Sequence, residues 1–189
     1  MTTLVALLRG INLGSTNRIA MPELRSALAD AGFENVRTYV QSGNILLDTE
    51  LEEGALAEIL ATLIAARFKL DVPVVVRGAA ELAEVVAANP FPDAASTAPK
   101  LLQVTFLSSP LPADVAERVR GASDGVFSPD TEAISLALSR RNVYGWHPQG
   151  IHVSKLARDL SDRKLGVIAT ARNWTTVTTL LEMASTDVG

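Results

Sequence analysis

The sequence has 189 residues, of which 48% are hydrophobic and 20% are charged, and its formal net charge at pH 7 is −4. This composition excludes disordered and fibrous proteins, and the acidic balance excludes a basic field over the whole molecule. Cysteine is absent, which excludes disulfides, thiolate catalysis and cysteine-bound zinc. The longest stretches without a charged residue have 13 residues, which is too short for a membrane span. The N-terminus lacks a basic region and has only five apolar residues before Arg9, so we expect no secretory signal and a cytoplasmic protein.

The first 77 residues alternate between short apolar runs and helical patterns. Runs of apolar and β-branched residues predict strands at 4–8, 36–40, 45–48 and 72–77. Apolar residues at helical spacing predict helices at 22–32 and 56–68. A loop rich in glycine and asparagine at 10–18 and a turn at 41–44 connect these elements. The order β-α-β-β-α-β is that of a ferredoxin-like unit.

The order of elements partly recurs in the second half of the chain. Residues 79–88 predict an additional helix, and residues 89–99, rich in proline, alanine and serine, are typical of a linker. Strands are predicted at 101–107, 126–128, 133–138 and 143–147. Helices are predicted at 112–121, from Ser154 to 160, and after Asn173, the serine and asparagine acting as caps.

The sequence therefore predicts an α+β fold of two ferredoxin-like halves packed together. Each half has an antiparallel sheet with helices on one face, and further helices follow at the C-terminal end. We place the first half at residues 1–78, a helix and linker at 79–99, and the second half at 100–189. One continuous α+β domain, in which the repeated order is coincidental, is the alternative. The sequence does not determine the oligomeric state.

The predicted topology brings the loop after the first strand and the turn at 41–44 to one end of the first sheet. This end gathers polar side chains, namely Arg9, Asn12, Asn17, Arg18, Gln41, Ser42 and Asn44. Its two arginines, and the backbone N–H groups at the start of the following helix, favour an anion or a polar small molecule. The alternative is that glycine and asparagine only satisfy turn geometry and that Arg9 is solvated.

Familiar catalytic and metal-binding motifs do not occur. The loop at 10–16 lacks both the Lys-Ser/Thr pair of a phosphate loop and the Gly-x-Gly-x-x-Gly pattern. His147 and His152 are five residues apart, and no third metal ligand stands out. Ser42 does not lie in a nucleophile elbow. We therefore predict no metal and no cofactor, name no catalytic residue, and leave open whether the protein is an enzyme.

Residues 140–172 form a basic segment, with seven lysines or arginines against two acids. Tyr144, Trp146 and Trp174 lie in or beside it, and basic groups interleaved with aromatics are typical of single-strand nucleic-acid binding. The tryptophans also fit a core, and the strands at 4–8 and 45–48 lack the aromatics of an RNA-binding sheet. We favour a small polar or anionic partner over nucleic acid and expect no membrane partner. A structural or interaction module without a ligand is a further alternative.

Several segments of the sequence are familiar in combination. They are ALLRGINLG, MPELRSALADAGFENVRTYVQSGNILLD, the NPF at 89–91, and TARNWTTVTTLLEMA. Together they resemble the bacterial domain-of-unknown-function family 1697, from Ala6 to Ala184. The resemblance implies two ferredoxin-like halves and no particular reaction. Only Ser15 and Thr16 depart from it, since a glycine-richer stretch is expected there.

The resemblance also emphasises particular residues. Its hallmark segments map onto Arg9, Gly10, Asn12, Thr38, Tyr39, Ser42, Gly43 and Asn44, and onto Thr170, Arg172, Asn173 and Trp174. The second group is expected at the N-terminus of the closing helix, another position suited to an anion. We predict as ligand-binding residues Arg9, Gly10, Asn12, Tyr39, Ser42, Gly43, Asn44, Arg172, Asn173 and Trp174.

Overall fold

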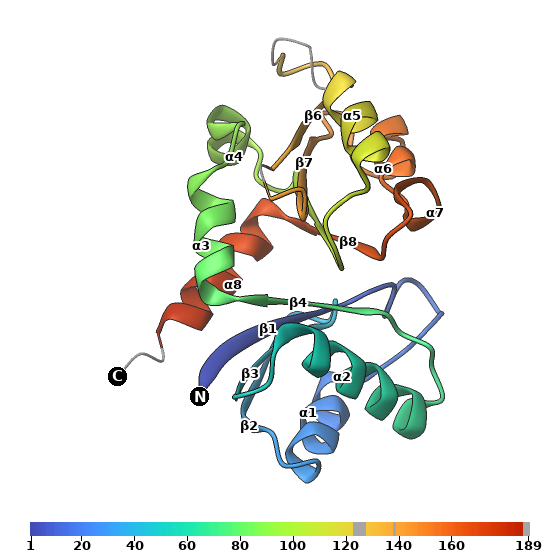
Figure 1. Cartoon of the computed structure of the whole chain (residues 1–189), viewed down its shortest axis with the longest axis vertical. Coiled ribbons are helices and arrows are strands. Elements are labelled where there is room, and N and C mark those ends of the chain that lie inside the picture. Colours follow the sequence, from blue (N-terminus) through green and yellow to red (C-terminus); the bar gives the residue numbers. More distant parts are fainter. Residues whose placement is uncertain (123–127, 138, 187–189) are drawn as a thin grey trace. The chain divides into compact units, whose positions relative to one another are not determined.

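The computed structural model describes residues 1–122, 128–137 and 139–186 (Figure 1). The chain forms two compact units. The first comprises residues 1–83 together with the end of the last helix from Leu180 onward, and the second comprises residues 84–179. None of the helices formed by the described residues combines the length and hydropathy needed to cross a lipid bilayer.

The first unit contains a four-stranded antiparallel sheet. Its strands are β1 (Thr2–Leu8), β2 (Glu34–Tyr39), β3 (Asn44–Thr49) and β4 (Val74–Gly78). They lie in the order β2-β3-β1-β4, and every neighbouring pair is antiparallel. Helices α1 (Met21–Asp30) and α2 (Glu53–Phe68) cover one face of this sheet, as Figure 1 shows.

The strand β1 lies at the centre of this unit and is buried on both faces. Leu4, Ala6 and Leu8 belong to the same apolar cluster as the inward residues of α1 and α2. Val5 and Leu7 point to the opposite face and are also buried. Burial on both faces explains why this strand is a continuous apolar run rather than an alternating one. Burial of each leucine stabilises the folded state by about 1.5–3 kcal/mol. The loop that follows β1 therefore starts from a stable strand.

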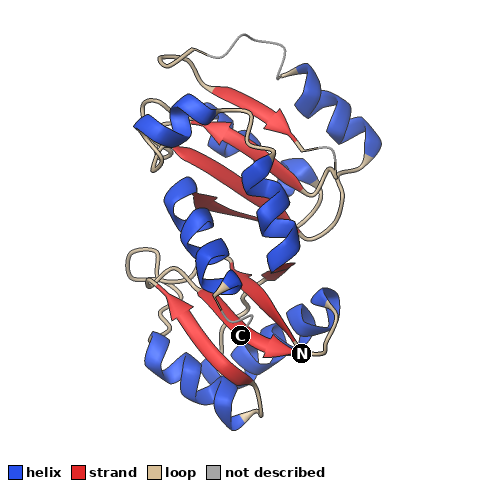
Figure 2. Ribbon diagram, turned by 90° about the vertical axis from the view of Figure 1, so that its left-hand side faces the viewer, coloured by secondary structure: helices blue, strands red, loops and turns tan. Residues whose placement is uncertain are grey.

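The second unit contains a sheet with the same strand arrangement. Its strands are β5 (Leu102–Leu107), β6 (Ala133–Leu136), β7 (Asn142–Trp146) and β8 (Ala169–Asn173). They lie in the order β6-β7-β5-β8, again with antiparallel neighbours. Figure 2 draws these strands in red and the helices in blue.

Six further helices accompany the strands in the described residues. They are α3 (Ala79–Ala87), α4 (Pro92–Thr97), α5 (Ala113–Gly121), α6 (Lys155–Asp159), α7 (Asp162–Leu165) and α8 (Trp174–Ser185). Helices α3 and α8 each contribute residues to both units. Within the first unit, Arg37 Nη1 on β2 donates a hydrogen bond of 2.9 Å to Met183 O in the last turns of α8.

The predicted fold class is confirmed, since each unit has a four-stranded antiparallel sheet. The first unit has the order β-α-β-β-α-β, and the second has the same order with its second helix divided into α6 and α7. Three details of the second half were wrong. The expected linker at 89–99 contains α4, and α7 was not anticipated. The strand β7 pairs with β6 as a hairpin, whereas the fourth strand of the sheet is β8. The strand predicted at 126–128 and the end of the one predicted at 133–138 fall partly outside the described residues.

The strand β8 was not predicted, and it contains residues that the family resemblance had placed at the start of the last helix. Thr170 and Arg172 lie on this strand, paired with β5, and not in the first turn of α8. Thr170 and Arg172 are buried and Ala171 between them is exposed, which is the alternation of a strand. Pairing with β5, a long-range contact, decides this conformation.

A buried histidine fixes the segment that follows β7. His147 is 1% exposed, and its Nδ1 lies 2.7 Å from Ser154 Oγ. That hydroxyl also accepts the Ala157 N–H at 2.9 Å, which confirms the predicted cap of α6. Burial lowers the pKa of His147 below its ordinary value of 6.5, although the Glu132 carboxylate acts in the opposite direction.

We expect the stability of the protein to fall in acid because His147 is buried in its neutral form. Below pH 6.5 the histidine binds a proton in the unfolded chain before it does so in the folded one, so stability decreases as the pH falls. This contribution has a slope of up to about 1.4 kcal/mol per pH unit. Urea unfolding between pH 7 and pH 5 should show a steeper loss for the natural chain than for His147→Gln. Equal slopes for the two proteins would contradict this assignment.

Candidate functional site

Three segments of the first unit meet at one end of its sheet, and we call this end the loop rim (residues 9–18, 41–44 and 69–73). Leu8 N donates to Gly43 O at 2.8 Å, and Arg9 N donates to Pro73 O at 2.9 Å. The side chain of Asn12 reaches across to Gln41 O, with its Nδ2 at 2.7 Å. The prediction that the first loop and the hairpin turn share one end of the sheet is confirmed.

Asn12 holds the first loop in shape. Its Nδ2 also donates to Ile19 O at 3.0 Å, and its Oδ1 accepts the Ile19 N–H at 2.9 Å. Asn17 closes the same loop, because its Nδ2 donates to Gly10 O at 3.1 Å. Gly10, Asn12, Gly14 and Asn17 all have positive φ, between 48° and 68°. Glycine and asparagine tolerate this conformation, so both asparagines serve the turn geometry.

Side-chain hydrogen bonds also hold the hairpin turn between β2 and β3 in shape. Asn44 is fully buried, and its Nδ2 donates to Tyr39 O at 3.1 Å and to Ser42 Oγ at 3.0 Å. Ser42 itself is exposed and Tyr39 is half-buried. The buried amide of Asn44 therefore fixes the hydroxyl of a surface serine.

The loop rim carries positive charge. Its three segments contain Arg9, Arg18 and Lys69 against one acid, Asp71, in a chain whose net charge is −4. Arg9 is half-buried, whereas Arg18 is exposed. Helix α1 begins just after the first loop, and its N-cap residue, Ala20, provides no side-chain cap for the first N–H groups. An anion at this end would meet both guanidinium charge and the positive end of a helix.

The remaining predicted site residues lie in the second unit. Arg172 is buried on β8, and its Nη1 donates to Thr170 Oγ1 and to Ala171 O, both at 2.8 Å. Burial lowers the pKa of Arg172 to about 10, so the side chain is still a cation at neutral pH. Asn173 Oδ1 accepts the Thr176 N–H at 2.9 Å, which confirms the predicted cap of α8. Trp174 is buried, and its backbone N–H donates to Pro99 O at 3.1 Å.

The structure thus separates the ten predicted residues into two groups. Seven lie in the first unit. Tyr39 ends β2, and the other six lie at the loop rim, namely Arg9, Gly10, Asn12, Ser42, Gly43 and Asn44. Three lie together in the second unit, namely Arg172, Asn173 and Trp174. Sequence reasoning missed a cavity of about 430 Å³ that α5, α6, α7 and β6 line in the second unit. The break between the short helices α6 and α7, signalled by Ser161, was the available sign.

Two comparisons relate the chain to known proteins. A model of the family described as "Protein of unknown function (DUF1697)" matches residues 1–136. Among solved structures, the chain is similar to the conserved bacterial protein SP0830 from Streptococcus pneumoniae, with a TM-score of 0.67 and 21% sequence identity. This similarity covers 97% of the present chain and 99% of that one, and at such an identity it supports the fold alone. A search of curated proteins finds no match.

We expect Gly43→Ala to destabilise the first unit by about 2–4 kcal/mol, because it combines strain and overlap. Gly43 has a φ of 73°, and an added Cβ would lie 2.7 Å from both Leu8 Cβ and Ile11 Cδ1. The Cβ of Leu8 cannot yield without moving β1.

Gly14→Ala is the matched control for this substitution. Gly14 has a φ of 60°, but an added Cβ there would meet nothing within 4 Å. It should cost only about 1 kcal/mol, the backbone strain alone. Chemical unfolding of both variants measures the difference, and equal losses would show that the close approach of Gly43 to β1 is unimportant.

Proposed function

The chain belongs to the DUF1697 family of proteins of unknown function, and we propose that its loop rim binds a small anionic or polar molecule. One observation carries the proposal. The first loop, which bears two arginines and no acid, is joined to the hairpin turn by the Asn12 side chain, whose Nδ2 donates to Gln41 O at 2.7 Å. A binding site that is already rigid loses little conformational entropy when its ligand arrives.

The groups at the loop rim suit recognition of an anion. Arg9 is half-buried, where a charge interacts more strongly than it does in bulk water. Arg18 is exposed and adds to the attraction at longer range. The hydroxyl of Ser42, held by Asn44, supplies a polar group of fixed position. These residues include no histidine or cysteine, and the proposal is one of binding without a named reaction.

The contacts of the second group support a structural role for Arg172, Asn173 and Trp174. The arginine bonds to its own strand, the asparagine caps α8, and the tryptophan is buried. Participation of these three residues in ligand binding stays a prediction. Nucleic-acid binding by the basic segment requires rings on which bases can stack. Tyr144 and Trp146 are 2% and 4% exposed, so the geometry gives that function no support.

Thermal unfolding in the presence of inorganic phosphate tests the proposal. At phosphate concentrations about 100-fold above the dissociation constant, a ligand of the folded state contributes about 2.7 kcal/mol, which raises the melting temperature by about 5–10 °C. Sodium chloride at matched ionic strength is the reference for general salt effects. We expect the phosphate-specific increase to be lost in the double variant Arg9→Gln, Arg18→Gln.

The double variant Lys100→Gln, Arg163→Gln is the matched control, because it also removes two positive charges, both from exposed positions in the second unit. It should leave the phosphate effect unchanged. An equal loss in this control and in the rim variant would assign the effect to net charge. A phosphate effect that persists in the rim variant would place the anion elsewhere.

A further inference from the structure

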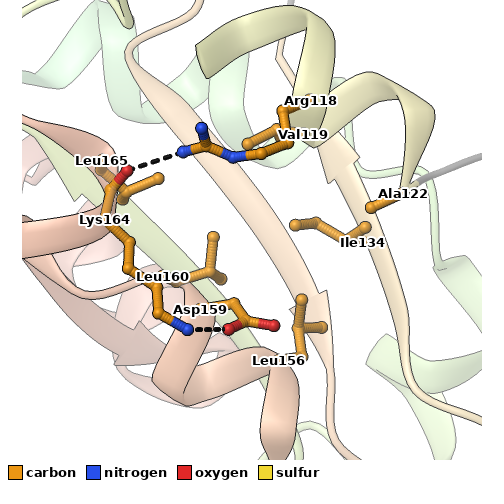
Figure 3. A pocket seen from close by; sticks show the side chains of 9 residues that line it. All are labelled: Arg118, Val119, Ala122, Ile134, Leu156, Asp159, Leu160, Lys164 and Leu165. Atoms are coloured by element: carbon orange, nitrogen blue, oxygen red, sulfur yellow. Dashed lines mark hydrogen bonds and ion pairs between the residues drawn. The ribbon is translucent and has the colours of Figure 1, made fainter.

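The second unit contains a cavity that none of the predicted site residues touches. Its volume is about 430 Å³, within the range typical of small-molecule sites. Six apolar and three charged residues line it: Val119, Ala122, Ile134, Leu156, Leu160, Leu165, Arg118, Asp159 and Lys164 (Figure 3). A cavity of this size with mostly apolar walls fits an organic molecule better than an inorganic ion.

The cavity follows from the way helices cover the second sheet. In the first unit, the 16-residue helix α2 buries Leu56, Leu60 and Ile64 against the strands. The corresponding stretch of the second unit is divided into α6 and α7, with five and four residues. These two short helices and α5 leave a space that reaches down to Ile134 on β6.

The apolar walls of the cavity are part of the core of the unit. Val119, Ile134, Leu160 and Leu165 belong to its buried cluster, and Leu156 packs against that cluster. An apolar group inside the cavity would therefore contact core side chains directly. Removing such a group from water contributes about 25 cal/mol for each Å² of apolar surface buried.

Two of the three charged residues at the cavity pair with each other, and the third is an arginine. Lys164 Nζ forms an ion pair with Asp159 Oδ1, and hydrogen bonding to this lysine lowers the pKa of the aspartate. Arg118 Nη2 donates to Lys164 O at 2.7 Å. In the part of the chain that the structure describes, Arg118 forms no ion pair, and its other N–H groups stay available as donors.

We propose that this cavity binds a small amphipathic anion, whose apolar part occupies the space between α5, α6 and α7 and whose carboxylate contacts Arg118. The guanidinium favours a carboxylate because it offers parallel N–H donors. The Lys164–Asp159 pair is neutral as a unit, so it does not oppose a negative head group. This site is distinct from the loop rim and lies in the other unit.

Calorimetric titration of the full-length protein with octanoate and with octylammonium tests the proposal. The two probes share an apolar chain and differ in the sign of the head group. We expect octanoate to bind at one site and octylammonium to bind at least about tenfold more weakly, because only the anion gains the charge-assisted hydrogen bond. No octanoate binding at millimolar concentration, or equal affinity for both probes, would overturn the proposal.

Substitutions locate the bound octanoate. Arg118→Gln should weaken its binding by about tenfold. Arg120→Gln is the matched control on the same helix, since Arg120 is exposed, pairs with Glu117 and does not line the cavity. Ala122→Trp, at an exposed position that lines the cavity, should fill the space and abolish binding. Arg18→Gln should leave octanoate binding unchanged.

Circular dichroism of each variant checks that it folds. If Ala122→Trp is destabilised, the comparison of Arg118→Gln with Arg120→Gln decides alone. Equal weakening by those two variants, or weakening by Arg18→Gln as large as that by Arg118→Gln, would overturn the placement of the anion at α5.

Discussion

The loop rim of the first unit depends on one side chain. Asn12 makes three hydrogen bonds, two to Ile19 within its own loop and one to Gln41 on the hairpin turn. No aliphatic side chain could make them, and aspartate lacks the amide donor. Because the same residue has a φ of 53°, both its backbone and its side chain favour asparagine. Together with the backbone bond from Leu8 N to Gly43 O, this connection holds the first loop against the hairpin turn.

The two units use the same strand order but differ in where they leave room for another molecule. In the first unit, the continuous helices α1 and α2 cover one face of the sheet, and the polar groups of the loop rim lie on loops beyond the strand ends. In the second unit, the helical layer is interrupted and a cavity opens beside α5. One arrangement of strands thus supports a charged edge in one case and an apolar space in the other, which agrees with the general separation of fold from function.

Much of the first unit was predictable because its signals are local. Local patterns indicate the secondary structure of their own segments, as at the apolar run 4–8, at Pro22 at the start of α1 and at the turn 41–44. The order of these elements then places the loops at one end of the sheet. The role of Asn12 was not predictable, since its partners Ile19 and Gln41 are identified only by folding. In the second unit, Asn173 both ends β8 and caps α8, so its capping signal concealed the strand before it. Apart from the helix break at Ser161, the cavity had no local signal in the sequence. Its walls come from α5 and from α6 and α7, which are far apart in the sequence.

The division of the second helical layer also affects how stability is distributed along the chain. Helices of four or five residues are not stable alone, and α6 depends on the Ser154 cap and on Leu160 and Leu165 for its attachment. The segment from 155 to 165 can therefore open without breaking any strand pairing, whereas α2 is joined to its sheet by Leu56, Leu60 and Ile64 along one continuous helix. Local opening of this segment would expose part of the core of the second unit to solvent at a lower free-energy cost than global unfolding.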